Sequence, residues 1–520
     1  MRENAQEVLT TACRGKADQR TRFRFLALGL VLTGFGFLTG CSDNFYSADI
    51  EYEVRTDPII AAFEPGLKEV AQLEPDQPGQ LPIRGLQSIK DPRNPYFAGE
   101  GSSLSEERLD AFKKSTVDPK KASRELTTKI GAELKKAFGT PRRPLVSGTL
   151  IKNGVNALRA SGNPRWTSYD PAGVDSALAT LKLDYAHLKE GSRLYRLHCL
   201  QCHGVTGNGR GPSAYWVNPH PRDYRSGWFK FQTTDRGNQY RKPLRKDLKR
   251  TLYVGVEGTS MPAFNQLPDE DLEALVSYVI HLSIRGEAEM KFFLDRTKTD
   301  PETGEIQLKD EVAGEGEKDD KGQKIAIAVR EEAAKVLRSW SEADSAGQFK
   351  VPTDPLYMES PDSPAYTASI LRGQALFLGD SKLLGKHYPP ELYLTRRPGS
   401  FEVTEAKDIQ PDEYKKVLKE LAENVANCKE CHVAYGTRAT YKFDEWGTMV
   451  AAANLMRGVY RGGRRPVDIY YRIHGGIKGS GMVNYGTSLK PGEVWDLVHF
   501  IRALPYEKHR ENPRFTLRPK

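Results

Sequence analysis

The sequence predicts a mainly α-helical protein with two related modules joined by less regular chain. One observation is a Cys-x-x-Cys-His pattern that occurs twice, far apart in the chain. Another is that an amphipathic helix is predicted after each pattern. The apolar faces of these two helices consist of Leu272, Leu275, Val276, Val279 and Ile280, and of Val494, Leu497, Val498 and Ile501. In addition, 520 residues exceed what one hydrophobic core usually organises.

The overall charge is positive and leaves several kinds of partner open. The formal net charge is +9, with a sequence pI of about 9.0. An excess of this size suits nucleic acid, anionic lipid or an acidic protein. Part of it lies in residues 14–24, so the rest of the chain is only mildly basic. We expect no nucleic-acid partner, because nothing beyond overall charge supports one.

The N-terminus has the pattern of an export signal. Basic residues at 14–24 precede an apolar run at 25–38, which ends in Leu38-Thr39-Gly40-Cys41. This pattern resembles a bacterial lipoprotein signal, which implies cleavage after residues 1–40 and lipid attachment to Cys41. An uncleaved anchor helix is the alternative. In both cases we expect a protein held at a membrane of the bacterial cell envelope and facing the periplasm, since no later apolar stretch has the length of a membrane span.

The cysteines carry the most specific signal in the sequence. Two of the six, Cys13 and Cys41, belong to the leader. The other four form two pairs, each followed at once by a histidine: Cys199, Cys202 and His203, and Cys428, Cys431 and His432. This is the attachment pattern of c-type haem. Two thiols one helical turn apart each form a thioether with a haem vinyl group, while the adjacent imidazole reaches the iron. The sequence therefore predicts two covalently bound haem c groups.

Other uses of the two cysteine pairs explain less of the pattern. A four-thiolate zinc site normally brings its pairs together within a short stretch of chain. A thioredoxin-like dithiol needs only one pair. A disulfide within each pair is the third alternative. All three alternatives leave both histidines without a role. Haem is the one interpretation that uses all six residues.

Around the first pattern, the sequence resembles the class I cytochrome c domain. The resemblance runs from Gly191-Ser192-Arg193-Leu194-Tyr195 through the haem motif to Gly207-Asn208-Gly209-Arg210-Gly211-Pro212. It implies two helices crossing at Gly191, a carbonyl of Pro212 that orients His203, and a distal methionine before the last helix. Met261, in Gly258-Thr259-Ser260-Met261-Pro262, is the predicted iron ligand. His220 and His281 are the alternatives.

The second module repeats this arrangement with one departure. Gly373 and Phe377 match the spacing of Gly191 and Tyr195, but an insertion at 378–424 delays the haem motif. We predict Met482 as the second distal ligand, although a valine follows it where a proline follows Met261. Its competitors are Met449, Met456 and His474. Three arginines before it, Arg461, Arg464 and Arg465, either pair with haem propionates or form a solvated basic loop.

The predicted domain organisation follows from these motifs. The fold class is mainly α, with two cytochrome c-like helical haem domains, an N-terminal extension and a charged, partly helical linker. Helices are also expected within 106–138 and 325–340, and an exposed linker at 286–322. The expected boundaries are 1–40 signal peptide, 41–177 extension, 178–285 first haem domain, 286–364 linker, 365–510 second haem domain and 511–520 tail.

The predicted ligands indicate an electron carrier. Iron held by His and Met has no open position for substrate, and a thioether ligand raises its potential. By resemblance, such lipid-anchored cytochromes serve in respiratory chains, here between a quinol-oxidising complex and a terminal oxidase, with redox proteins as partners. We therefore expect no enzyme activity. The alternative is a diheme peroxidase-like enzyme, which requires one haem that opens to substrate.

Overall fold

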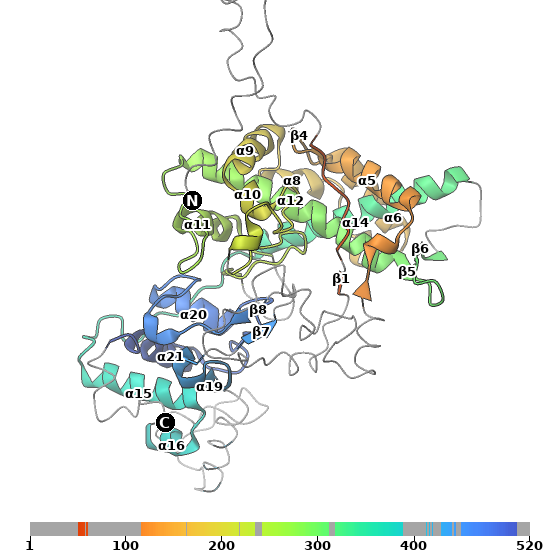
Figure 1. Cartoon of the computed structure of the whole chain (residues 1–520). Coiled ribbons are helices and arrows are strands. Elements are labelled where there is room, and N and C mark those ends of the chain that lie inside the picture. The colour runs from red at the N-terminus through yellow and green to blue at the C-terminus, as the bar shows by residue number, and fades with distance from the viewer. Residues whose placement is uncertain are drawn as a thin grey trace, which may run out of the picture. The chain divides into compact units, whose positions relative to one another are not determined.

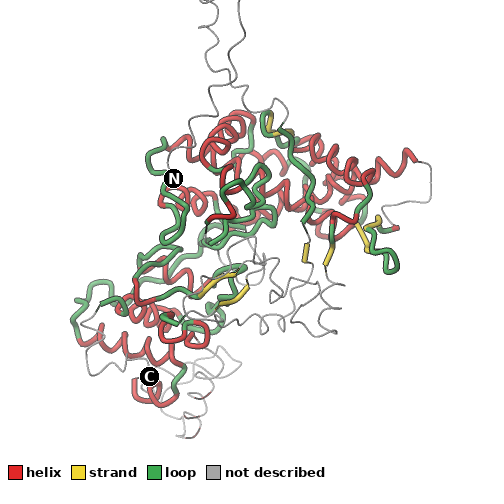
Figure 2. Tube along the Cα trace, in the orientation of Figure 1, coloured by secondary structure: helices red, strands yellow, loops and turns green. Residues whose placement is uncertain are grey.

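The computed structural model describes only part of the chain. The described residues are 50–57, 59–60, 116–162, 164–217, 219–234, 242–310, 318–387, 428–438, 441–443 and 449–506, with single residues at 412, 415 and 419. The leader, Cys41 and most of the insertion at 378–424 lie outside them. Helices predominate in the described part, where strands form four two-stranded sheets (Figures 1 and 2), and this confirms the predicted mainly helical fold class. No described helix combines the length and apolar character that crossing a membrane requires.

Helices of very different length follow one another along the chain, with short strand pairs among them. The helices are α5 (Arg124–Phe138), α6 (Gly148–Ala160), α7 (Pro164–Thr167), α8 (Gly173–Thr180), α9 (Tyr185–His198), α10 (Leu200–His203), α11 (Arg245–Val254), α12 (Asp269–Arg296), α14 (Lys318–Ala346), α15 (Pro364–Leu378), α16 (Ser381–His387), α19 (Cys428–Cys431), α20 (Pro466–Gly475) and α21 (Pro491–Ala503). The strand pairs, all antiparallel, are β1 (Ile59–Ile60) with β2 (Thr116–Val117), β3 (Gly139–Thr140) with β4 (Arg143–Pro144), β5 (Thr297–Thr299) with β6 (Ile306–Leu308), and β7 (Tyr441–Phe443) with β8 (Met449–Ala451).

The first module is organised by the crossing of α9 and α12. Asp184 caps α9, since its carboxylate accepts hydrogen bonds from the backbone N–H groups of Ala186 and His187. At the crossing, a Cβ atom added to Gly191 meets the carbonyl of Ala274 and the side chain of Tyr278. The absence of a side chain at this position therefore lets the two backbones approach, as expected from the sequence.

The second module repeats this crossing with α15 and α21. A Cβ atom added to Gly373 meets the carbonyl of Asp496 and the side chain of Phe500. Phe377, one turn further along α15, packs on the Phe500 ring with centroids 5.4 Å apart. The predicted match between Gly191 and Gly373 thus has the same structural cause in both modules.

Further helices enlarge the core of the first module. Helix α14 contains the predicted helical segment 325–340 and contributes Trp340, which is almost fully buried. It packs closely on α6, where the backbone of Arg330 leaves no room for a side chain at Gly154. Of the segment 106–138 in which a helix is expected, residues 106–115 lie outside the described part. Residues 116–123 form a short strand and a 3-10 turn, and Ser123 caps α5, which begins at Arg124.

The charged segment after residue 285 differs from the exposed linker expected there. Helix α12 continues to Arg296, and its residues Glu287 and Glu289 are buried. Glu287 pairs with the buried Lys242, and Glu289 pairs with Arg285. The expectation is wrong over this stretch because the charges neutralise one another inside the protein instead of facing water.

Substituting either crossing glycine by alanine is expected to destabilise the protein. Gly191→Ala and Gly373→Ala each force two helices apart, and such overpacking costs about 1–3 kcal/mol. Gly322→Ala is the matched control, because this helical glycine of α14 has no atom near its Cβ position. The control should raise stability by up to about 1 kcal/mol. Chemical denaturation of the holoprotein measures all three, and equal stability of the crossing variants and wild type contradicts the packing argument.

Candidate haem-binding site

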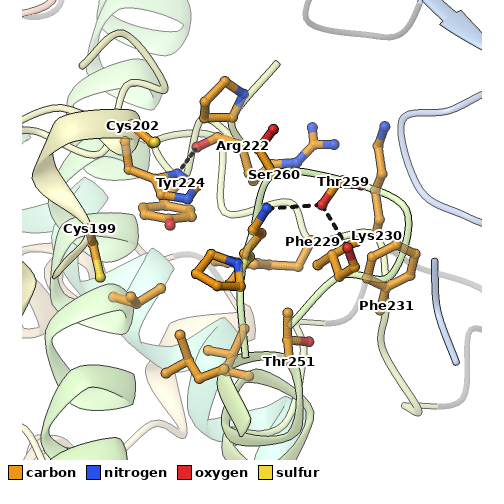
Figure 3. Close-up of a pocket in the computed structure, with 18 of the residues that line it drawn as sticks. Cys199, Cys202, Arg222, Tyr224, Phe229, Lys230, Phe231, Thr251, Thr259 and Ser260 are labelled. Atoms are coloured by element: carbon orange, nitrogen blue, oxygen red, sulfur yellow. Dashed lines mark hydrogen bonds between the residues drawn. The ribbon is translucent and has the colours of Figure 1, made fainter. Parts of the chain in front are cut away.

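The first haem motif follows directly from the end of α9. The backbone N–H of Cys199 donates to the carbonyl of Tyr195 at 2.8 Å, and that of His203 donates to the carbonyl of Cys199 at 2.9 Å. The chain therefore stays helical from α9 into α10. Figure 3 shows Cys199 and Cys202 in the wall of a cavity that His203 and Met261 also line. The structure thus brings all four predicted residues of the first site to one cavity.

A backbone carbonyl fixes the orientation of His203. Its Nδ1 lies 3.1 Å from the carbonyl oxygen of Arg222, the contact drawn in Figure 3. A carbonyl only accepts hydrogen bonds, so Nδ1 carries the proton and Nε2 keeps its lone pair for a metal. Burial lowers the pKa of His203 to about 4, which keeps the imidazole neutral. The sequence-based assignment of this role to Pro212 is wrong, because Arg222 supplies the carbonyl.

The cysteines of this site include a buried thiol, and neither belongs to a cluster of metal-binding side chains among the residues that the structure describes. Burial raises the pKa of the Cys199 thiol to about 12. It is therefore a neutral thiol at pH 7. In the described part of the chain, no group of three or more His, Cys, Asp or Glu side chains is arranged to hold a metal ion. None of the four motif cysteines forms a disulfide in the structure.

The lining of this cavity suits the haem that the motif implies. It is mainly apolar, with Phe229, Phe231 and Leu275 among the wall residues. An apolar wall with a neutral imidazole, a thioether and two thiols matches the donors of a covalently held haem. His220 also lines this cavity. His281 does not belong to it and is buried in α12, where its Nε2 lies 2.9 Å from the carbonyl of Phe138.

The loop that carries Met261 is tied to the end of α11. Helix α11 ends at Val254 and is followed by Gly255, and the N–H of Val256 then donates to the carbonyl of Met261 at 3.2 Å. Within the loop, the hydroxyl of Thr259 donates to the carbonyl of Val256 at 2.7 Å and accepts from the N–H of Met261 at 3.2 Å. These bonds close the loop on itself, so the position of Met261 is set by the backbone.

The same loop recurs in the second module, at the end of α20. The N–H of Ile477 donates to the carbonyl of Met482 at 3.0 Å. The hydroxyl of Ser480 donates to the carbonyl of Ile477 at 2.8 Å, as Thr259 does in the first loop. Each residue of the second loop follows its counterpart in the first at the same interval along the chain. The valine after Met482 therefore replaces the proline after Met261 without changing these two hydrogen bonds, although the bond from the N–H of Met261 to the Thr259 hydroxyl has no counterpart at Met482.

The second haem motif has the same histidine arrangement as the first. His432 follows α19, and its Nδ1 lies 3.0 Å from the carbonyl oxygen of Ala453. Burial lowers the pKa of His432 and raises that of the Cys428 thiol to about 12. Met482 packs at the edge of the second hydrophobic core, as do Cys428 and Met456. The pattern at His203 is thus repeated at His432.

The competitors of Met482 occupy other parts of the second module. His474 stacks on Phe349 with ring centroids 4.0 Å apart. Met449 lies in β8, and Met456 lies in a 3-10 turn next to Leu455. Met482 shares the loop position of Met261, whereas none of the three competitors does. The iron ligands of both sites stay predictions.

Comparison with known proteins gives one family match. Residues 188–283 match the family model of cytochrome c. This cytochrome c domain supports covalently bound haem and haem-based electron transfer. The match contains the first haem motif, the crossing of α9 with α12, and Met261.

The other comparisons add little. No curated protein matches the chain significantly. Among solved structures, a reducing HAO-like protein complex from Kuenenia stuttgartiensis aligns with a TM-score of 0.34 and 18% identity, over 61% of this chain and 96% of that one. A TM-score this low does not establish a shared fold.

Two features of the cytochrome c domain were not found from the sequence. The carbonyl of Arg222 has no side-chain signature, so only the fold reveals it. The Tyr224 ring stacks on His203 with centroids 4.8 Å apart, and an aromatic residue two positions after the residue that supplies the carbonyl is a weak signal by itself. Both residues lie in a loop for which the sequence analysis predicted no such role.

The helices on either side of the Met261 loop are joined by Glu273. This carboxylate of α12 pairs with Arg245 at 2.7 Å and Lys249 at 3.0 Å, both on α11, and with Lys182 at 3.0 Å. Burial alone raises the pKa of Glu273, but these three partners outweigh it and lower the pKa to about 2. Because the folded pKa lies below the unfolded one, the stabilisation is complete above about pH 5 and is lost as the pH falls towards 2.

Glu273→Gln is therefore expected to destabilise the protein in a pH-dependent way. At pH 7 the loss is about 1–3 kcal/mol, reduced from the full pKa shift because the group is partly solvated. The difference from wild type should shrink at pH 3. Urea unfolding at both pH values measures it, with the exposed Glu270→Gln on the same helix as control. A difference that does not change with pH contradicts the ionic role of Glu273.

Proposed function

We propose that this protein is a lipid-anchored electron carrier with two covalently bound haem c groups. The observation that carries the proposal is the repeated loop, in which Met261 and Met482 occupy equivalent places after α11 and α20. Each loop accompanies a Cys-x-x-Cys-His motif and a helix crossing at a glycine. Two copies of one haem-binding arrangement are the simplest reason for this duplication.

The ligands proposed for the irons are His203 with Met261 and His432 with Met482. Cys199 and Cys202, and Cys428 and Cys431, would hold the macrocycles. When bound, such a haem supplies a one-electron couple, whose potential is raised by the thioether ligand. The protein keeps both imidazoles neutral by burial and holds their rings with the carbonyls of Arg222 and Ala453. With a histidine and a methionine bound to each iron, neither site would offer a place for substrate, and we propose no enzyme activity.

The cellular role is proposed from the leader and the charge. Lipidation at Cys41 would hold the protein at a bacterial membrane facing the periplasm. Its partners would be redox proteins, such as a quinol-oxidising complex as donor and a terminal oxidase as acceptor. The mildly basic chain favours quick, weak docking to acidic surfaces, as electron exchange requires.

The number of haems per chain is the first test. A soluble form that begins after Cys41, made in a host that attaches haem c, is expected to contain two haems per polypeptide by pyridine haemochrome assay. Mass spectrometry of a wild-type digest should find haem mass on both motif peptides. Cys428→Ala with Cys431→Ala should reduce the count to one. Haem on the first motif alone contradicts the two-haem proposal and leaves a single cytochrome c domain.

The state of each iron is the second test. In an optical potentiometric titration, both haems are expected to be low-spin and to titrate at positive potential, because thioether ligation favours the ferrous form. Met261→Ala and Met482→Ala should each lower the potential of one haem and leave the other unchanged. A wild-type haem that is high-spin and binds added ligand, or titrates at strongly negative potential, supports the diheme peroxidase-like enzyme instead.

A further inference from the structure

We propose that Arg461, a residue of the second module, binds the propionate carboxylates of the haem in the first module. The first haem site is then completed by the second module. This inference rests on the proposed function, since it requires a haem in the cavity that Cys199, Cys202 and His203 line.

The position of Arg461 is the first argument. It lines the first cavity together with His203 and Met261, although it is far from both in the sequence. Its loop is held there from both sides. Arg250 of α11 donates to the carbonyl of Gly462 at 3.3 Å, and the buried Gly462 lies against the ring of Phe231, another residue of the cavity wall. Arg461 is therefore anchored at the cavity through its neighbour.

The second module also fixes the cavity wall that faces this loop. Arg472 of α20 donates to the carbonyls of Lys230 at 3.1 Å and Gln232 at 2.7 Å. Its guanidinium carbon lies 5.7 Å from the centre of the Phe231 ring. The segment of the wall around Phe231 is thus held from the second module. Arg461 and its cavity consequently form one packed arrangement and not a chance approach of a surface loop.

The charge of Arg461 is the second argument. The sequence predicts three arginines of this loop as possible partners for propionates, and the structure shows which of them already have carboxylate partners. Arg464 pairs with Glu257 at 2.9 Å, and Arg465 pairs with Asp468 at 3.0 Å. Among the described residues, Arg461 has no carboxylate and no hydrogen-bond partner. It is the member of the three with a charge still available for an anion.

The surroundings of Arg461 favour such an anion. The residue is accessible to solvent, yet the protein atoms around it bury it enough to lower its pKa. The side chain is thus reached by solvent through the cavity and is also surrounded by protein atoms. A guanidinium at a mainly apolar wall loses hydration that a bidentate carboxylate replaces. A haem brings two carboxylates to the site, and Arg461 is suited to receive them.

The experiment compares the midpoint potentials of both haems in Arg461→Gln, Arg461→Lys and the matched control Arg464→Gln. Removing the positive charge beside the first haem favours its ferric form, so Arg461→Gln should lower one midpoint. The expected change is about tenfold in the one-electron equilibrium constant, ~59 mV. The same midpoint should become more dependent on pH between about 5 and 8, because an unpaired propionate titrates closer to neutrality. Arg461→Lys should retain part of the wild-type potential.

The outcomes separate this inference from the proposed function. The haem whose midpoint moves is identified in the background of Cys428→Ala with Cys431→Ala, which retains only the first haem. A fully loaded Arg461→Gln with unchanged midpoints overturns the role of Arg461 and leaves the carrier function intact. An equal shift in Arg464→Gln also overturns it, because the effect is then a general one of charge. Absence of covalent haem from the wild type defeats the proposed function itself.

Discussion

The close crossing of two helices at a glycine is the constraint on which each module depends. In the first module, α9 leads directly into the haem motif, and the segment before α12 carries Met261. The contact of Gly191 with the backbone of Ala274 fixes how these helices lie on each other. It therefore also fixes where the motif that ends α9 lies relative to the loop that precedes α12. A side chain at the crossing changes this relation, and with it the site between them.

The loops obey a second constraint, which is local and polar. Each begins at a glycine with positive φ, Gly255 at 70° and Gly476 at 62°, a conformation that side chains rarely adopt. Helices α11 and α20, which precede the two loops, also begin in the same way. Asp247 and Asp468 each accept a hydrogen bond from the backbone N–H three residues earlier, at the start of their helix. Because both ends of the helix are fixed, the loop that follows it holds its methionine at one position. This explains why the repeat survives the change of proline to valine after the methionine.

Much of this arrangement was accessible from the sequence, because local chemistry determined it. The haem motifs, the crossing glycines, the last helices and the Met loops all have signatures in residue type and spacing. What could not be predicted depends on partners distant in the chain. Arg222 orients His203 through its backbone carbonyl, which no side-chain pattern reveals. The resemblance therefore led to the assignment of this role to Pro212. The charges of Glu287 and Glu289 led to the prediction of an exposed segment, since nothing in the sequence shows that Lys242 and Arg285 are buried beside them.

The charges around the first site divide into a balanced set and an unbalanced one. Arg225 pairs with Asp223 at 2.7 Å and with Asp57 at 2.8 Å, and Arg55 pairs with the same Asp57 at 2.8 Å. Burial alone raises the pKa of Asp57, but the two arginines outweigh it and hold that pKa well below its usual range. Two arginines and two aspartates thus fix the backbone beside Arg222 without adding net charge.

Arg461 contrasts with this network. No described residue neutralises it, and it comes from the other module. A balanced network that orients His203 has little influence on whether the iron is ferric or ferrous, because its opposite charges largely cancel at a distance. A single cation at the cavity wall acts on that equilibrium directly. Under the proposed role of Arg461, the first module positions its own haem, whereas the second module sets part of the electrostatic field in the cavity. If both modules hold haem as proposed, the two haems can in this way differ in potential while their modules share one architecture.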